Sequence, residues 1–422
     1  MKKRSYRRIP VKAFSLERVK AAVPVGRLVF SVDVAKTDMV AGIADGQGHV
    51  IAFVSWKHPA ESVDVLALLR SLQAAGYVVE AVMESSGTYG DVLRHQLDSL
   101  GIRVFKVSGK RTHDAREIYD GVPSLHDAKC AAIIAKLHVD GISAPWPQMT
   151  DDKRNLKAAL ALMDLFQERY LQLVHRLESW LARYWPELPD IIDLTSASLM
   201  ALLARIGGPH EVAAEPDKSR RLLRGMSHGL MDAAKVELVI AGAHASCGVP
   251  MLTLEREALS AIAQEAHTAL RAFKGAKMKV EALVTDSPAR HMAATVGKST
   301  AAVFMSEVGD PALFPSSSAY VKGFGLNLKE KSSGKEQGHL RITKRGSGRA
   351  RQYLWLAVFR WVKTDPVAKA WYQKKIARDG GKKAKAVVAL MRKLARALFH
   401  VGRGQAYDAA KLFDFKSLGL EI

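Results

Sequence analysis

The sequence predicts a mixed α/β domain near its N-terminus, followed by long helices and a mainly α C-terminal domain. Between residues 26 and 148, short apolar runs typical of β-strands alternate with helical patterns. Apolar residues then recur at helical spacing over residues 151–185 and 254–284. After these, short apolar helices are separated by turns rich in glycine and basic residues.

Composition limits the classes of function. The 422 residues include 63 Lys and Arg against 42 Asp and Glu, a net charge of +21, which points to nucleic acid as the partner. No apolar run approaches the ~20 residues that span a bilayer, and no signal peptide precedes Asp33, so we expect a cytoplasmic protein with no membrane partner. With only Cys130 and Cys247, we expect neither a disulfide framework nor a cysteine zinc site.

Residues 1–25 form a basic N-terminal arm, with Tyr6 between arginines and lysines. We expect it to be disordered until bound. Its function would be to contact phosphates; the alternative is that it serves only as a solubilising tail.

The first domain begins with three predicted strands, and a turn at residues 45–48 joins the second to the third. A helix and then alternating strands and helices follow. This order is typical of an RNase H-like mixed sheet with the first strand at its centre. The expected strands are residues 28–34, 39–45, 49–56, 77–83 and 103–107, and the expected helices are 62–75, 89–100 and 131–137.

Three acidic residues stand at corresponding places in these elements. Asp33 and Glu84 end two apolar strands, and Asp127 opens an apolar helix. Clustered carboxylates repel one another, so a hard divalent cation best explains such a group. One or two Mg²⁺ ions held in this way cleave phosphodiesters. Alternatively, any one of these acids alone could be only a helix cap or a turn residue.

The two long helices form a connector, helical or coiled-coil, over residues 149–285. The first ends at the prolines of residues 186–189, and the second follows a break at 248–250. They would pack on each other or on another protomer. The short stretches 199–209 and 301–311 resemble each other and half of a helix-hairpin-helix, although any helix can end in Gly and Pro.

Residues 323–361 hold the densest basic segment, read as loops leading into an aromatic-rich helix. Glycine, serine and cations together suit a phosphate backbone, and a serine there, such as Ser333, could attack phosphorus. The alternative is a flexible basic loop whose serines are only solvated. The residues expected to bind nucleic acid are Lys331, Lys335, Arg341, Lys344, Arg345, Arg349 and Arg351.

Both ends of the chain resemble the DEDD transposases of insertion sequence family 110, relatives of the pilin gene invertases. The resemblance covers about residues 26–140 and 285–405 and leaves the middle as a helical linker. The motifs that carry it are residues 32–36, 83–89 and 124–131 at one end and 296–297, 307–310, 324–326, 333–334, 342–346 and 385–398 at the other.

The resemblance implies a RuvC-like first domain in which Asp33, Glu84 and Asp127 bind Mg²⁺. It also implies a catalytic serine at Ser333, with Ser332 as the nearest alternative. The family's fourth acid is replaced by Cys130, and thiolate is a poor ligand for Mg²⁺. Three carboxylates would suffice, or Asp114 or Asp120 would substitute, or this copy is impaired.

The expected function is therefore a DNA transposase or recombinase that cuts and rejoins donor and target DNA for insertion-sequence mobility. An element-encoded bridge RNA and assembly as a homo-oligomer, dimer or tetramer, are implied by the resemblance. The alternatives are a Holliday-junction endonuclease and a catalytically impaired nucleic-acid-binding protein. The expected segments are 1–25, 26–148, 149–285, a C-terminal transposase domain at 286–405 with helix-hairpin-helix-like elements, and a tail at 406–422.

Overall fold

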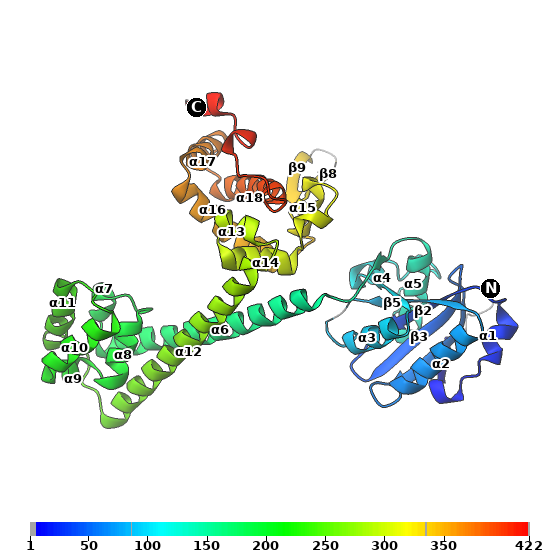
Figure 1. Cartoon of the computed structure of the whole chain (residues 1–422), viewed down its shortest axis with the longest axis horizontal. Coiled ribbons are helices and arrows are strands. Elements are labelled where there is room, and N and C mark those ends of the chain that lie inside the picture. Colours follow the sequence, from blue (N-terminus) through cyan, green and yellow to red (C-terminus); the bar gives the residue numbers. More distant parts are fainter. Residues whose placement is uncertain (1–5, 86, 334–335, 421–422) are drawn as a thin grey trace. The chain divides into compact units, whose positions relative to one another are not determined.

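A computed structural model of the chain describes residues 6–85, 87–333 and 336–420, and the side chains of residues 331–339 are outside the described set. The chain divides into two compact units, Met1–Thr150 and Asp151–Ile422. Each unit is described by itself (Figure 1).

The N-terminal unit is built on one seven-stranded sheet with the order β1-β4-β3-β2-β5-β6-β7. The central strand β2 pairs antiparallel with β3 and parallel with β5, so the predicted strands and their order agree with the structure. This sheet is compatible with the expected RNase H-like architecture. The strands are β1 (Arg8–Pro10), β2 (Arg27–Asp33), β3 (Asp38–Asp45), β4 (Val50–Lys57), β5 (Val78–Glu84), β6 (Arg103–Val107) and β7 (Ala144–Pro145).

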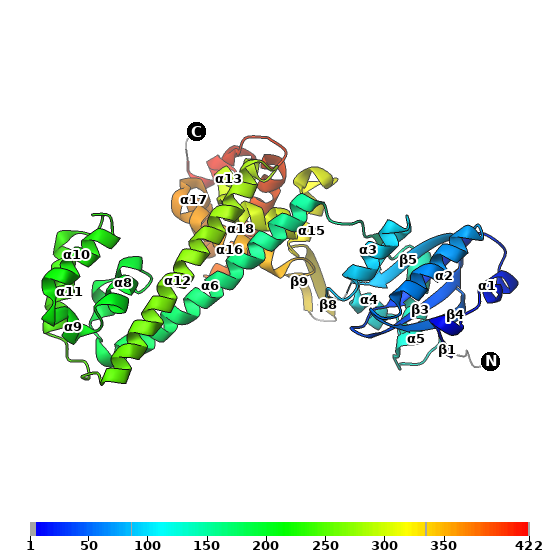
Figure 2. The same ribbon diagram turned by 60° about the horizontal axis from the view of Figure 1, so that its bottom comes forward.

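Helices cover both faces of this sheet (Figures 1 and 2). They are α2 (Ser62–Ala74), α3 (Asp91–Ser99), α4 (Gly109–Asp114) and α5 (Asp127–Val139). Because side chains alternate along a strand, Phe30 and Val32 of β2 belong to the core shared with α2 and α3. Val29 of β2 and Val82 of β5 belong to the core on the opposite face, beneath α5.

The expectation that the N-terminal arm is disordered is wrong for its described part. β1 pairs in parallel with β4, and the helices η1 (Val11–Ala13) and α1 (Glu17–Ala22) follow it. Val11 and Val19 are buried in the core beneath α2. Pairing with the exposed edge of β4 and burial of these two valines order the segment, although its charge alone suggested a tail.

The C-terminal unit is organised along two long helices, α6 (Asp151–Tyr184) and α12 (Thr253–Thr285), which pack on each other. Their apolar stripes belong to two separate cores. The end of α6 and the start of α12 join one core with α7 (Leu188–Ile191), α8 (Ala197–Arg205), α9 (Pro209–Ala214), α10 (Pro216–Met226) and α11 (Ala233–His244). The pair is therefore antiparallel and carries a helical cluster at each end.

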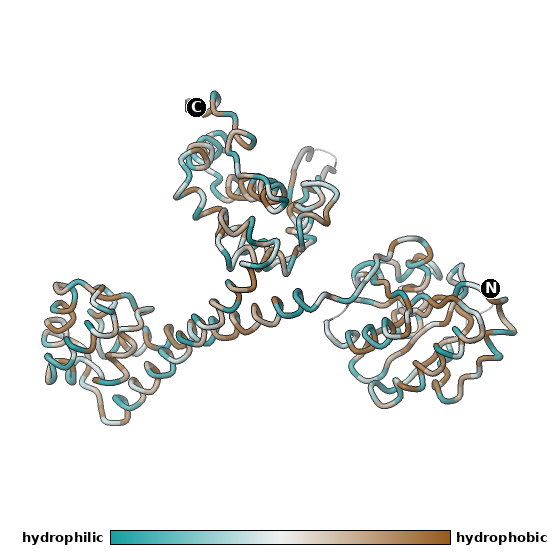
Figure 3. The backbone as a smooth tube through the Cα atoms, in the orientation of Figure 1, coloured by the Kyte–Doolittle hydropathy of each residue, from teal (hydrophilic) through white to brown (hydrophobic). Residues whose placement is uncertain are grey.

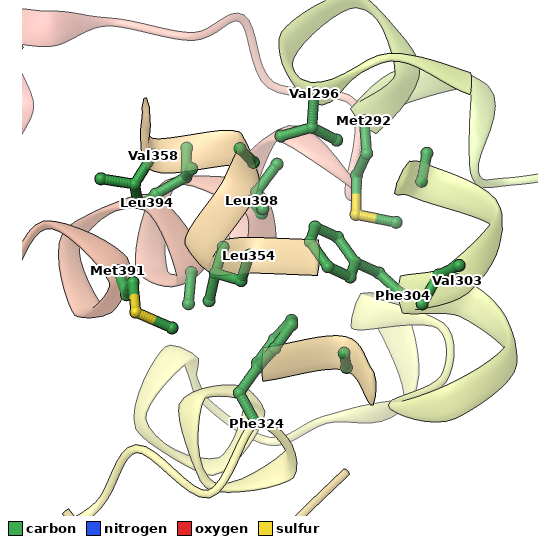
Figure 4. Close-up of a cluster of buried hydrophobic side chains, with 14 of the residues drawn as sticks. Met292, Val296, Val303, Phe304, Phe324, Leu354, Val358, Met391, Leu394 and Leu398 are labelled. Atoms are coloured by element: carbon green, nitrogen blue, oxygen red, sulfur yellow. The ribbon is translucent and has the colours of Figure 1, made fainter. Parts of the chain in front are cut away.

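The second core joins the start of α6 and the end of α12 to the C-terminal helices. In Figure 4, Phe304 and Phe324 face Leu354 and Leu398 at its centre. The tube in Figure 3 shows the hydrophobic stretches of both units running through their interiors. The helices are α13 (Arg290–Val296), α14 (Lys298–Glu307), η2 (Pro311–Leu313), α15 (Ser317–Gly323), α16 (Gly348–Thr364), α17 (Pro366–Arg378), α18 (Lys383–Val401), η3 (Ala409–Lys411) and α19 (Phe415–Leu418).

The basic segment expected as loops contains a β-hairpin. β8 (Leu328–Ser333) pairs antiparallel with β9 (Glu336–Ile342), and α16 follows as predicted. After β9 the chain packs tightly on the residues that follow α15, because a Cβ at Gly346 would lie 2.4 Å from both the carbonyl oxygen of Gly323 and the amide nitrogen of Gly325. Glycine at 346 is therefore required by close backbone approach.

Neither cysteine forms a disulfide. None of the described helices combines the length and the apolar composition needed to cross a bilayer.

Candidate active site

Two of the predicted acids lie side by side at one edge of the N-terminal sheet. Asp33 is the last residue of β2, and Glu84 is the last residue of the neighbouring parallel strand β5. Val29 and Val82, on the α5 face, are an even number of residues from Asp33 and Glu84 respectively, so both carboxylates are on that face.

The first turn of α5 brings Asp127 and Cys130 to the same place. A spacing of three residues puts them on one side of the helix. Burial, then the charges of Asp127 and Glu84, raises the pKa of Asp33 to about 6, and a hydrogen bond with Cys130 partly opposes the rise. Burial and the same carboxylates raise the pKa of the Cys130 thiol to about 12, so it is neutral at physiological pH. These four side chains therefore lie near one another.

A fourth carboxylate, on the same strand as Glu84, behaves differently. Glu80 is buried on β5 but pairs with Arg27 (Nε to Oε2, 2.6 Å), with Arg103 and with His138. Burial would raise its pKa, but the hydrogen bond and charge of Arg27, with help from His138 and Arg103, lower it. Glu80 is thus neutralised by the protein itself, whereas Asp33 faces other carboxylates.

Arg8 of β1 reaches the site as well. Its Nη1 lies 2.8 Å from Oδ2 of Asp127, and both side chains are about half exposed. No sequence signal distinguished Arg8 from the other basic residues of the arm, because the contact depends on β1 pairing with β4.

Gly109 at the start of α4 provides room for Glu84. A Cβ at this position would lie 2.3 Å from Oε1 and 2.9 Å from Cδ of Glu84. Any side chain at 109 would therefore displace the Glu84 carboxylate. Gly109 carries no distinctive signal in the sequence, since one glycine after a strand has many explanations.

Asp114 and Asp120, the suggested substitutes for the missing fourth acid, have other partners. Asp114 is exposed and pairs with Lys110 at 3.1 Å. Asp120 accepts hydrogen bonds from Lys129 Nζ (2.9 Å), the amide of Val122 (3.0 Å) and the Tyr6 hydroxyl (3.0 Å). The hydrogen bond from Lys129 leads the causes that lower the pKa of Asp120. The structure therefore brings Cys130, and neither aspartate, beside Asp33.

The chemistry of the donors fits a hard divalent cation. Carboxylate oxygens are the ligands that Mg²⁺ prefers, and the mutual repulsion at Asp33 is relieved by a positive charge. In the described part of the chain, however, no three His, Cys, Asp or Glu side chains are already arranged closely enough to hold an ion. Arg8 pairs with Oδ2 of Asp127, so an ion bound through this oxygen would have to replace the ion pair.

The predicted serine site is described only in its backbone. Ser332 and Ser333 belong to β8, and their side chains, with those of Lys331 and Lys335, lie outside the described residues. Arg341, Lys344 and Arg345 are exposed in β9 and the turn after it.

Arg349 and Arg351, also expected to bind nucleic acid, are engaged within the C-terminal unit. Arg349 pairs with Asp164 at 2.7 Å and with Glu307 at 3.7 Å, and Arg351 donates to the carbonyl of Phe324 at 3.0 Å. Their described contacts give both guanidinium groups a structural role.

The helix-hairpin-helix hypothesis requires glycine amides that are free to bind phosphate. The amides of Gly207 and Gly309 instead donate to carbonyls of the preceding helices, at 3.3 Å and 3.0 Å. The amide of Gly208 donates to Oε2 of Glu211 at 3.0 Å. These bonds are those of ordinary helix ends, which was the alternative explanation of the repeat.

Comparison with known proteins places both ends of the chain in one family. Residues 30–186 match a family model of DEDD-type IS110 transposases, and residues 293–373 match a model described as "Transposase IS116/IS110/IS902 family". The chain is also similar to the "Insertion element IS110 uncharacterized 43.6 kDa protein" of Streptomyces coelicolor, with 23% identity over 360 residues, which cover 81% of this chain and 86% of the relative. The two family models together cover more than half of the 422 residues, in the expected order. The chain belongs to the IS110 family of transposases, enzymes that act on DNA.

Proposed function

We propose that this transposase cleaves and rejoins DNA with Mg²⁺ bound by Asp33, Glu84 and Asp127. The observation that carries the proposal is that β2, β5 and α5 bring these carboxylates near one another, where burial and then the charges of Asp127 and Glu84 raise the pKa of Asp33. A bound divalent ion would supply Lewis-acid stabilisation of the negative charge that develops during phosphodiester cleavage.

The three acids differ in how they are held. Asp33 and Glu84 end paired strands, so the sheet sets their positions. Gly109 of α4 also fits closely against the Glu84 carboxylate. Asp127 is on the exposed first turn of α5 and is neutralised by Arg8. We infer that Arg8 holds Asp127 in place of an ion and releases it when the ion binds.

The C-terminal unit would supply the nucleophile. We place this role at Ser333 on the strength of the family resemblance, with Ser332 as the alternative. The hydroxyl oxygen would form an ester with the DNA phosphorus while a sugar oxygen leaves, and nearby cations would stabilise the charged phosphate. Arg341, Lys344 and Arg345, which are exposed in β9 and the turn after it, suit this second task.

Two experiments test the proposal. Asp33→Ala or Glu84→Ala should abolish strand cleavage and leave non-specific DNA binding intact, because the acids repel phosphate. Unchanged recombination in either variant would remove the metal site from the mechanism. Separately, a covalent protein–DNA adduct should form with wild type and Ser332→Ala but disappear with Ser333→Ala.

Cys130 favours a second candidate function. A neutral thiol stands where the family's fourth acid is expected, and this favours a nucleic-acid-binding protein with impaired catalysis. A Holliday-junction nuclease would use the acids without a serine. Cleavage of junctions without any adduct would support the nuclease, and DNA binding without cleavage would support the impaired protein.

An element-encoded bridge RNA and assembly into a dimer or tetramer complete the proposal, both from the family resemblance. Sequencing of RNA that copurifies with the protein tests the first. The molar mass of the DNA complex in solution tests the second.

A further inference from the structure

The last segment of the chain, expected only as a tail, folds back on α18 and encloses a cavity of about 280 Å³. Basic side chains approach this cavity from both sides. Lys393, Arg396 and His400 line it from α18, and Lys411 lines it from η3, where Asp408 adds the only carboxylate of the lining. A water takes about 30 Å³ of liquid, so the cavity accepts a hydrated group larger than one water.

Part of this arrangement is structural. Lys393 donates to the carbonyl of Leu412, and its Nζ lies 4.9 Å from the ring centre of Phe413 and 5.4 Å from that of Trp371. Asp408 caps η3 through the amide of Ala410 at 2.9 Å. These contacts fasten the returning segment to the helix, but they do not involve Arg396 or His400.

The remaining charges are not balanced. Arg396 and Lys411 are exposed, and Asp408 lies 4.0 Å from Lys411, at the limit of an ion pair. Within the described part of the chain Arg396 has no carboxylate partner. Burial, and then the charge of Arg396, lowers the pKa of both Lys393 and Arg392, so Arg396 lies close enough to repel these two cations. An anion would relieve this repulsion.

We propose that this cavity binds a phosphodiester group of a nucleic-acid strand. A guanidinium fork and an ammonium on opposite walls suit phosphate oxygens, and the imidazole of His400 can donate a further hydrogen bond. The exposed edge of the site would let a continuous strand pass over it, and DNA is the substrate of this enzyme family. The site goes beyond the proposed function, because it uses neither the acids nor the serine.

The test is DNA binding by the full chain in EDTA, where no cleavage interferes. The double variant Arg396→Gln/Lys411→Gln is compared with Lys382→Gln/Lys383→Gln, which removes the same charge at the opposite end of α18. The expected result is a dependence of log Kd on log salt that is shallower by about one to two units than in the control pair. Equal slopes in the two pairs would overturn the proposal.

Three further measurements separate a direct contact with DNA from other causes of a change in binding. Arg396→Lys should keep most of the affinity, and the thermal midpoint of the double variant should match that of the control. A double variant that fails to fold is replaced by Arg396→Gln alone, whose slope should still fall by about one unit. DNA should also protect Lys411 from acetylation. Protection by inorganic phosphate but not by DNA would show a free-anion site and overturn the assignment to a nucleic-acid strand.

Discussion

Replacing Asp33 with Asn should stabilise the metal-free N-terminal unit at neutral pH, although it should abolish cleavage. The pKa of Asp33 is raised from 3.8 to about 6, because its carboxylate is partly buried and faces Asp127 and Glu84. A carboxyl group whose pKa is higher in the folded state contributes its full stabilisation of that state below pH 3.8, where it is protonated in both states. This stabilisation is lost as the pH rises through about 6, because the folded state must then hold an ionised carboxylate. Asn keeps the side chain neutral at every pH.

A shift of about two pKa units corresponds to about 3 kcal/mol, at about 1.4 kcal/mol for each unit. Since Asp33 is only partly buried, solvent screening reduces the expected gain in the free energy of unfolding to about 1–2 kcal/mol at pH 7.5. The difference in the free energy of unfolding between the variant and wild type should be small at pH 4 and constant above about pH 7.

The assay is amide hydrogen exchange of peptides from β2 and β5 in the full chain with EDTA, corrected for the intrinsic exchange rate at each pH. The exposed Asp38, replaced by Asn, is the control and should show no such pH dependence. Adding Mg²⁺ should narrow the difference in stability between the variant and wild type, because the ion stabilises the ionised Asp33 of wild type. A gain of equal size at pH 4 and 7.5, or a less stable variant at pH 7.5, would contradict the electrostatic explanation.

Three other changes test the neighbours of Asp33. Cys130→Asp should lower the Mg²⁺ concentration for half-maximal cleavage, since a hard oxygen replaces sulfur; an unchanged requirement would place Cys130 outside the ligand set. Gly109→Ala should reduce cleavage at least tenfold, because the new methyl group would displace Glu84; full activity would show that Glu84 need not stay in place. Arg8→Gln should also lower the Mg²⁺ requirement, by freeing Asp127; a higher requirement would mean that Arg8 supports the site.

The sequence alone located two of the acids. Asp33 and Glu84 follow apolar runs of strand length, and the alternation of side chains along parallel neighbours places their carboxylates on one face at one edge. The apolar runs and the alternation of side chains are local properties with period two, although the pairing of β2 with β5 joins distant segments. The same reasoning predicted the long helices, whose periodicity extends over more than thirty residues each.

Sequence reasoning was less successful where charge alone had to indicate structure. The basic arm was expected to be disordered, but pairing of β1 with β4 orders its described part. The segment around residues 328–342 was expected as loops, but it forms a hairpin. Backbone pairing with a distant or returning strand adds hydrogen bonds that composition does not reveal.

Tertiary structure alone decided which charged groups meet. Asp127 was the predicted ligand and Asp120, seven residues before it, a suggested substitute for the fourth acid; Lys129 neutralises Asp120, while α5 turns Asp127 and Cys130 toward Asp33. The physical reason is the short range of these interactions: a carboxylate responds to charges within a few ångströms, and only the packing of α5 on the sheet sets those distances.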